Sequence, residues 1–390
     1  MKRRFAALVC IAAGAWLGAT ADAQPQGPYA SKPIRLISPF AQGRRTGSRR
    51  GGWCWGGDGA RPPGWMRRLA TALATATGAL AFAVSSASLA QTYPTKPIRL
   101  ISPFAPGGGA SIMARYIGQE LTEAWGQSVV VDNRGGGGGV IGTEMAARAL
   151  PDGYTLVMAT ASTIAVNPVV SKVPFDPIKD FTPIVHTSTV PLVLVVHASL
   201  PVKSVKELIG YSRDPQAKLN YASSGEGTIS HLSGELFKSM TGAVLVHVPY
   251  KGGGQAVIDL VAGHVQTGFV NILEALPHVN SGRLRGLAVS TASRSAVMPN
   301  TPTVAESGVP GFEVTQWSGV LAPAGLPAAI ATQLNREIGR ILAKPEMRER
   351  LLASGADPGG GPPEKFAALI RSDIAKWSKL ARSLKLDARH

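Results

Sequence analysis

The stretch that most constrains the fold is KPIRLISPFAPGGGASIM, residues 96–113. Residues 98–104 are mostly apolar and lead into a proline and three glycines, a pattern that predicts a short buried strand ending in a loop. From Ser111 onward, apolar residues recur at helical spacing, which predicts a helix directly after the loop. Backbone N–H groups at a helix start lack intrahelical partners and carry partial positive charge. The stretch therefore predicts one half of an anion-binding site.

Downstream of this stretch, predicted strands and helices alternate. The first unit contains predicted strands at 128–131 and 154–159 with a helix at about 140–150 between them, and it ends in an apolar strand at 191–197. Such alternation is typical of a parallel sheet with helices on both faces. The first unit is therefore expected to form one α/β lobe.

A second unit of similar length repeats the alternation. Ser204 and Glu207 form a capping box, which predicts a helix at 204–212. The other predicted strands and helices are strands at 219–223, 244–250, 266–270 and 284–289, and helices at 231–240 and 255–263. Two such units predict two lobes with a cleft between them.

The end of the chain is expected to return to the first lobe. Residues 312–323 are extended and follow a proline-rich segment, which predicts a crossover between the lobes. Helices are predicted after it at 328–343, at 345–353 and from 363 onward, the last with an inner stripe of Phe366, Ile370, Trp377, Leu380 and Leu384. The expected lobes are residues 92–194 with 318–390, and residues 195–317.

The positive charge of the chain is concentrated near its start. The chain carries 40 Lys/Arg and 24 Asp/Glu, a net charge of +16. Twelve of the basic and two of the acidic residues precede residue 91, so residues 91–390 have a net charge of only +6. A surplus of this size is typical of a solvated surface and suits the attraction of small anions. No nucleic-acid partner is expected.

The first 90 residues contain two candidate export signals. Residues 1–23 and 66–90 each combine a basic start, an apolar middle and a small-x-small cleavage pattern. KPIRLISPFA follows both signals, but the copy at 32–41 does not continue into a domain. Our hypothesis is that residues 1–65 are spurious or the remnant of a tandem paralogue and that Met66 is the working start. The alternative is a genuine linker after a cleaved first signal. The mature protein is expected to be soluble and outside the cytoplasm.

Three glycine-containing loops fall between a predicted strand and a predicted helix. Their sequences are PFAPGGG, SSGEGT and YKGGG. Open α/β sheets bind ligands at the carboxyl ends of their strands, so three such loops together favour ligand contact. Simple turn geometry would explain any one of them alone. The five glycines at 135–139 are interpreted as structural.

The motifs give no support to catalysis or metal binding and only weak support to nucleotide binding. The sequence has no G-x-G-x-x-G loop at the triple glycine, no H-E-x-x-H and no G-x-S-x-G, and its seven histidines lack metal-ligand spacing. Both cysteines, Cys10 and Cys54, lie in the front section, so no thiol chemistry is expected in the folded part. His231 is interpreted as a capping or packing residue, with anion contact as the alternative, and Trp317 and Trp377 as core. We expect binding without catalysis, metal or cofactor.

Residues 92–390 resemble the substrate-binding receptors of tripartite tricarboxylate transporters, the TctC-like or Bug family. Eleven matching runs occur in the family's order, which makes the resemblance specific. The runs are YPTKPIRLISPFAPGGG, VVVDNRGGGGGVIG, PDGYTL, DPIKDFTPI, SVKELI, YASSGEGTISHLSGELF, HVPYKGGGQAVIDLVAGHVQ, GRLRGLAVST, MPNTPTVAESGVPGFE, WSGVLAPAGLP and PPEKFAALI.

The resemblance implies a fold, a ligand class and partners. The fold is an α/β, two-lobe periplasmic-binding-protein fold of type II, a Venus flytrap in which each lobe is a sheet flanked by helices. The ligand is a small carboxylate-bearing organic anion, and the partners are the membrane subunits of a tripartite tricarboxylate-type transporter. A periplasmic monomer is expected. The alternatives are a periplasmic sensor that feeds a signalling partner, and an α/β enzyme that acts on a carboxylate.

In such receptors the ligand carboxylate is held by backbone groups and ordered water between the lobes. Carried onto this sequence, the first-lobe contacts are Phe104, Ala105, Gly107, Gly108, Gly109, Ala110, Ser111, Thr160 and Ser162. The second-lobe contacts are Ser224, Gly225, Thr228, Tyr250 and Gly252.

The sequence departs from the family's pattern in two loops. Relatives commonly have Thr-Asp after the triple glycine, where this chain has Ala110 and Ser111. The loss of a carboxylate there is expected to disfavour a ligand that bears an amino group. The usual R-P-G-A-G-G is here RGGGGG, which predicts a more flexible loop.

Overall fold

The computed structural model describes residues 93–383. The chain divides into two units, residues 1–86 and 87–390, and all described residues belong to the second. The two expected export signals, the proposed extension 1–65, both cysteines and Leu384 lie outside the described residues.

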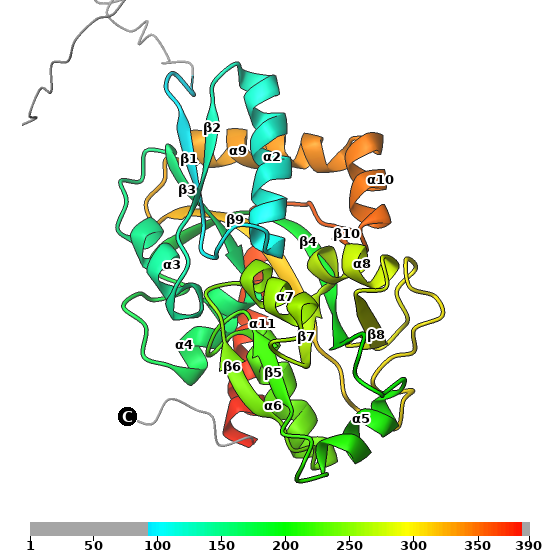
Figure 1. Ribbon diagram of the computed structural model, residues 1–390. Coiled ribbons are helices and arrows are strands. Elements are labelled where there is room, and N and C mark those ends of the chain that lie inside the picture. The colour runs from blue at the N-terminus through cyan, green and yellow to red at the C-terminus, as the bar shows by residue number, and fades with distance from the viewer. Residues whose placement is uncertain (1–92, 384–390) are drawn as a thin grey trace, which may run out of the picture. The chain divides into compact units, whose positions relative to one another are not determined.

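Ten strands form one mixed sheet in the order β2-β1-β3-β9-β4-β7-β5-β6, with β8 and β10 also paired to β4. The strands are β1 (Ile98–Ser102), β2 (Val129–Asn133), β3 (Thr155–Thr160), β4 (Phe181–His197), β5 (Asn220–Ser223), β6 (Val246–Pro249), β7 (Thr267–Asn271), β8 (Leu284–Val289), β9 (Thr315–Pro323) and β10 (Asp357–Pro358). Figure 1 shows β4 running between the two ends of this sheet.

The long strand β4 joins two half-sheets. Its first part, Phe181 to Pro191, pairs with β9, and its second part pairs with β7 and β8. Pairing is parallel within β2-β1-β3 and within β7-β5-β6, as expected from the alternation. The parallel pairing does not extend to β4, β8 and β9, which are antiparallel to their neighbours. The reason is that β4 and β9 carry the chain directly from one half to the other, without a helical crossover.

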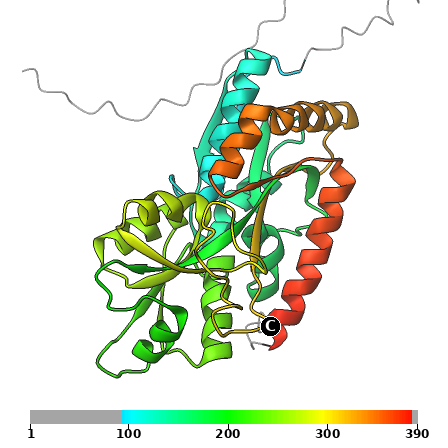
Figure 2. The same cartoon turned by 90° about the vertical axis from the view of Figure 1, so that its right-hand side faces the viewer.

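Helices cover both half-sheets. They are α2 (Gly109–Trp125), α3 (Val140–Ala147), α4 (Asn167–Val170), α5 (Val205–Ser212), α6 (Ile229–Thr241), α7 (Gly253–Ala262), α8 (Ile272–Asn280), α9 (Ala328–Ala343), α10 (Pro345–Ala353) and α11 (Pro363–Ser383), with a 3₁₀ turn η1 (Gly137–Gly139) and a π-helical turn η2 (Ser162–Val166). The C-terminal helix α11 packs against β4 and η2 of the first half (Figure 2).

Both faces of the sheet are buried. Along β3, Leu156 and Met158 belong to one apolar cluster, whereas Val157 and Ala159 belong to another. This separation follows from the alternation of side chains along a strand, and it explains why central strands such as β3 are nearly continuous apolar runs. Trp317 and Trp377 are buried in the second cluster, as the sequence predicted.

Candidate functional site

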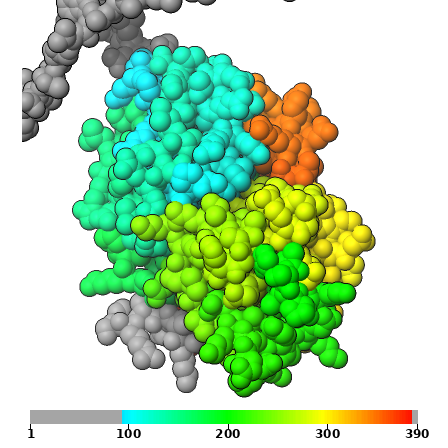
Figure 3. Space-filling view, in the orientation of Figure 1, coloured from blue at the N-terminus to red at the C-terminus, as the bar shows by residue number. Residues whose placement is uncertain are grey.

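The loops that follow the strands of the two halves are in direct contact. The backbone N–H of Ala105 donates a hydrogen bond to the carbonyl oxygen of Lys251 at 3.1 Å. A Cβ at Gly252 would lie 2.8 Å from the Ala105 nitrogen, so only glycine permits this approach. On the face shown in Figure 3, the cyan atoms of the first half lie against the yellow-green atoms of the second. The two halves are therefore closed on one another.

The five-glycine run also lies at this contact. A Cβ at Gly138 would overlap the carbonyl oxygen of Glu226, which follows β5 in the other half. The Asn167 side-chain amide donates a hydrogen bond to the Gly138 carbonyl at 2.8 Å and holds the turn in place. Gly138 also has φ +62°, a conformation that favours glycine. The glycines thus serve close approach and turn geometry, and none of the five lines the pocket described next.

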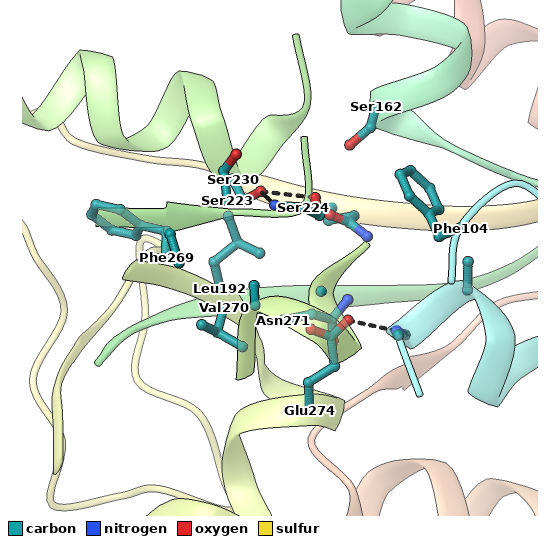
Figure 4. Close-up of a pocket in the computed structure, with 17 residues that line it drawn as sticks. Phe104, Ser162, Leu192, Ser223, Ser224, Ser230, Phe269, Val270, Asn271 and Glu274 are labelled. Atoms are coloured by element: carbon teal, nitrogen blue, oxygen red, sulfur yellow. Dashed lines mark hydrogen bonds between the residues drawn. The ribbon is translucent and has the colours of Figure 1, made fainter. Parts of the chain in front are cut away.

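A narrow pocket lies between the two halves, with about 30 Å³ available to the centres of water-sized molecules. In Figure 4, Phe104 and Ser162 lie on one side of it, opposite Ser223, Ser224 and Ser230. The pocket is lined by Phe104, Gly108, Gly109, Ala110, Ser162, Leu192, Ala222, Ser223, Ser224, Ser230, Gly253, Ala256, Phe269, Val270, Asn271, Glu274 and Gln316.

Four helices begin at the wall of this pocket. Gly109 and Gly253 are the first residues of α2 and α7, Ser230 lies in the first turn of α6, and Asn271 is the N-cap of α8. The N-caps of α2 and α7 are glycines, which provide no side-chain cap. Four positive helix ends and two sets of N–H donors without a local cap make the pocket favourable for an anion.

Glu274, in the first turn of α8, is the one ionisable side chain in the wall. Its Oε1 accepts a hydrogen bond of 2.6 Å from the backbone N–H of Gly109 (Figure 4). A Cβ at Gly253 would overlap the other carboxyl oxygen, so the carboxyl group lies between the starts of α2 and α7. Burial raises the pKa of Glu274 to about 7, although the Gly109 bond acts in the opposite direction.

The hydroxyl groups on the other side of the pocket belong to a polar network. Ser230 Oγ accepts from the Ser224 backbone N–H at 2.9 Å, and Ser223 Oγ lies 2.6 Å from His247 Nε2. The His247 ring is stacked on the His231 ring. Burial lowers the pKa of both imidazoles, to about 4 for His247. No carboxylate is hydrogen-bonded to either ring among residues 93–383, so the Ser223–His247 pair lacks the third member of a catalytic triad.

The comparisons with known proteins identify the family. The model of the tripartite tricarboxylate transporter family receptor matches residues 113–386. The chain belongs to this receptor family. Three solved structures are similar to it: an R. palustris protein with adipate (39% identity, TM-score 0.74, covering 76% of this chain and 100% of that one), the periplasmic binding protein BugD (32%, 0.73, 76% and 100%), and MatC from Rhodopseudomonas palustris with bound malate (31%, 0.71, 74% and 99%).

These relatives confirm two sequence-based expectations for the receptor. The resemblance to the TctC-like or Bug family is correct. The fold is the α/β, two-lobe periplasmic-binding-protein fold, because the similar structures are proteins of that kind and the described residues form a curled mixed sheet with flanking helices.

The receptor brings six of the fourteen predicted contact residues to the pocket wall. They are Phe104, Gly108, Gly109, Ala110, Ser162 and Ser224. Four others support these residues from behind the wall. Ala105 and Gly252 join the two loops, Thr228 Oγ1 donates to the Gly225 carbonyl at 2.6 Å, and Thr228 also caps α6.

The remaining four predicted residues lie outside the pocket wall. Gly107 is exposed. Ser111 and Thr160 are buried outside the wall, and the Tyr250 hydroxyl donates to Asp259 at 2.7 Å. Sequence reasoning named these residues because it treated each loop as a unit, whereas successive loop residues face different directions.

The pocket residues that sequence reasoning missed come from strands β4, β5, β7 and β9 and from the first turns of α6, α7 and α8. They are Leu192, Ala222, Ser223, Ser230, Gly253, Ala256, Phe269, Val270, Asn271, Glu274 and Gln316. Asn271 and Glu274 carried a usable signal. An Asn N-cap with a Glu three residues later predicts a helix start immediately after β7, at the same sheet edge as the glycine loops.

The described part of the receptor contains neither a membrane-spanning helix nor a metal-binding cluster. No helix between residues 93 and 383 is long and apolar enough to cross a membrane. Within the same range, no three His, Cys, Asp or Glu side chains are grouped so that they could hold a metal ion.

Proposed function

We propose that the receptor captures a small carboxylate-bearing organic anion in the pocket between its lobes and delivers it to the membrane subunits of a tripartite tricarboxylate-type transporter. It acts in the periplasm, as a monomer, without catalysis or a cofactor. The observation that carries this proposal is the convergence of four helix N-termini on one pocket whose wall contains no Lys, Arg or His.

The binding mode follows from this convergence. A carboxylate at the starts of α2 and α7 accepts hydrogen bonds from backbone N–H groups of both lobes, and such charge-assisted bonds are stronger than neutral ones. Because the donors belong to different lobes, they can act together only when the lobes are closed. The adipate and malate in the solved relatives support a carboxylate as the ligand.

The domain boundaries and contact residues given by sequence analysis belong to this proposal. Lobe 1 comprises residues 92–194 and 318–390, and lobe 2 comprises residues 195–317. β4 pairs with β9 up to residue 191 and with β7 from residue 192 onward, and this change of neighbour supports the boundary between the lobes. Of the fourteen predicted contacts, the six in the pocket wall are proposed to touch the ligand, whereas the other eight lie behind or outside the wall.

Ligand-dependent stabilisation tests the function. The purified full chain is melted with adipate, malate, a tricarboxylate, an aromatic acid and the uncharged amide of each. At a hundred times its dissociation constant, the correct acid adds about 2.7 kcal/mol to the free energy of unfolding. This corresponds to a rise in melting temperature of roughly 5 to 10 °C for a protein of this size. Stabilisation by an acid but not by its amide is expected. Equal shifts with acid and amide would contradict the carboxylate clamp.

The start of the protein is tested separately. We propose that Met66 is the working start and that cleavage follows residues 88–90. Intact-mass analysis of protein exported to the periplasm should then give an N-terminus near Gln91. A mature N-terminus near Gln24 would show that the first signal is used and that residues 24–65 are part of the protein.

A further inference from the structure

The Glu274 carboxyl group lies where the proposed ligand carboxylate is expected. It comes from α8, yet its Oε1 accepts the 2.6 Å hydrogen bond from Gly109 at the start of α2. Its second oxygen lies so close to the start of α7 that a Cβ on Gly253 would overlap it. The side chain lines the pocket and is half-buried. Any small anion in this narrow pocket is therefore a near neighbour of Glu274.

No cation among residues 93–383 compensates this carboxyl group. The charged and titratable side chains on the elements around it are Arg115, Tyr116, Glu120 and Glu123 on α2, His186 and His197 on β4, Lys251 before α7, Asp259 on α7, His278 on α8, and Arg283 and Arg285 at β8. None of these forms a hydrogen bond or ion pair with Glu274 in the described structure, and none lines the pocket. Only the partial charges of the helix ends stabilise an ionised Glu274.

Two ionised carboxylates cannot share such a site favourably. Like charges at short distance in a desolvated pocket raise the pKa of one member of the pair, as they do when two carboxyl groups share one proton. Glu274 already has its pKa raised to about 7 by burial. An incoming carboxylate raises this pKa further, so Glu274 is neutral in the complex at neutral pH.

We propose that Glu274 is a ligand-contacting residue that takes up one proton from solvent when the receptor binds its carboxylate, and then donates a hydrogen bond to that carboxylate. This rests on the proposed function. Oε1 keeps the hydrogen bond from Gly109, and the proton resides on Oε2. No covalent bond to the ligand forms or breaks. The receptor thus binds a carboxylate and a proton together.

An ionised Glu274 would do something different. It would pair with an ammonium group and would therefore select an amino-bearing ligand. The two roles predict opposite responses to pH. A proton-coupled site loses affinity as the pH rises above the pKa of Glu274, whereas an ammonium-binding site gains affinity.

Isothermal titration calorimetry of the full chain tests the proposal. The probe is the acid of the melting panel that stabilises the protein most, titrated between pH 6 and pH 8.5, where simple carboxylates stay ionised. At pH 8.5, titrations in two buffers with different heats of ionisation should show uptake of about one proton per ligand. The affinity should fall by up to about tenfold per pH unit above pH 7.

Two variants sharpen the test. Glu274→Gln keeps a neutral hydrogen-bond donor, so it should bind the same acid with an affinity that does not change with pH and without proton uptake. Glu313→Gln removes an exposed carboxylate of the same lobe that has no hydrogen bond or ion pair among the described residues, and it should behave as the wild type. The buffer experiment on the wild type remains decisive if Glu274→Gln does not fold.

Three results would overturn the proposal. They are binding without proton uptake, an affinity that rises with pH, and loss of binding in a folded Glu274→Gln variant. If no acid binds the wild type at any pH, the proposed function itself has failed. That result differs from carboxylate binding without proton uptake, which would refute only the role of Glu274.

Discussion

The imidazole rings of His231 and His247 are stacked with their centroids 4.0 Å apart and their planes 14° from parallel. Burial is the main cause of the lowered pKa of each ring, and the neighbouring ring adds to this for His247. His247 Nε2 lies 2.6 Å from the hydroxyl of Ser223, which lines the pocket. A neutral histidine pair therefore supports one wall of the pocket.

Acid should destabilise the receptor through this pair. The folded pKa of His247, about 4, lies below its unfolded value of 6.5, so the unfolded state binds protons more readily between these values. The stability that the neutral ring provides is present above pH 6.5 and is lost as the pH falls through 4. His247→Gln should reduce this acid-dependent loss of stability by about 1 to 2 kcal/mol. This value allows for the partial exposure of the ring, because solvent screens its interactions. Urea titrations at several pH values measure the loss.

The control for this prediction is His264→Gln. His264 lies in the same lobe, and 71% of its side chain is exposed. This variant should keep the wild-type dependence of stability on pH between 4 and 6.5. Equal curves for wild type and His247→Gln would show that the stacked pair does not titrate as described.

The five-glycine run provides a matched test of lobe closure. Gly137 and Gly138 have nearly equal φ, +57° and +62°, so alanine causes similar backbone strain at both positions. Only at Gly138 would the new Cβ overlap the other lobe, at the Glu226 carbonyl. Gly137→Ala should lose about 1 kcal/mol of stability, and Gly138→Ala should lose more, because its Cβ would also lie 3.0 Å from the Asn167 amide nitrogen. Only Gly138→Ala should also lose ligand affinity, by roughly tenfold or more, which equals about 1.4 kcal/mol. Calorimetry that finds equal affinities would contradict a closure role for Gly138.

Glu274 should make the ligand-free protein less stable as the pH rises. Its folded pKa of about 7 lies above the ordinary value of 4.5, so the folded state holds the proton more tightly. The stability from the protonated form is fully present below pH 4.5 and is lost as the pH rises through 7. The shift corresponds to at most about 3 kcal/mol. Denaturant titrations of Glu274→Gln should show this loss removed, and Glu313→Gln should retain it. If Glu274→Gln lost as much stability as the wild type when the pH rises, another group would be responsible for the loss.

Element boundaries were predicted best where the sequence marks them. The helix limits 328–343 and 345–353 agree with α9 and α10, because Pro327 and Pro345 mark the two helix starts. The glycine loop after β1 also leads into α2 as predicted, although α2 begins at Gly109, before Ser111.

The elements that were missed combine conflicting local signals. β4 begins at Phe181 rather than residue 191, because the segment FTPIVHTSTV is interrupted by Pro183 and polar residues, and pairing with β9 overrides its weak pattern. η2 and α4 lie in STIAVNPVV, whose β-branched residues favour a strand. α8 follows β7 without a loop and contains Pro277.

α8 was not predicted from the sequence, and for this reason the predicted site did not include Asn271 and Glu274. Without a helix start at Ile272, nothing placed Asn271 and Glu274 at the sheet edge where the glycine loops meet. The bond from Gly109 to Glu274 joins residues that are 165 positions apart, and the local pattern of neither residue predicts it. Backbone donors could be predicted from the loop sequences, but the side chain between them required the three-dimensional structure.

The predicted and the observed positions of Ser111 differ. The sequence placed it among the ligand contacts, but its hydroxyl is buried outside the pocket wall and has no hydrogen-bond partner among the described residues. A buried hydroxyl without a partner destabilises the folded state, and alanine is a better helix former than serine. Ser111→Ala should therefore raise the free energy of unfolding by about 1 kcal/mol and leave ligand affinity unchanged. Ser224→Ala, which alters the wall itself, should lower the affinity. Denaturant titration and calorimetry of both variants check this, and a loss of affinity in Ser111→Ala would return Ser111 to the ligand site.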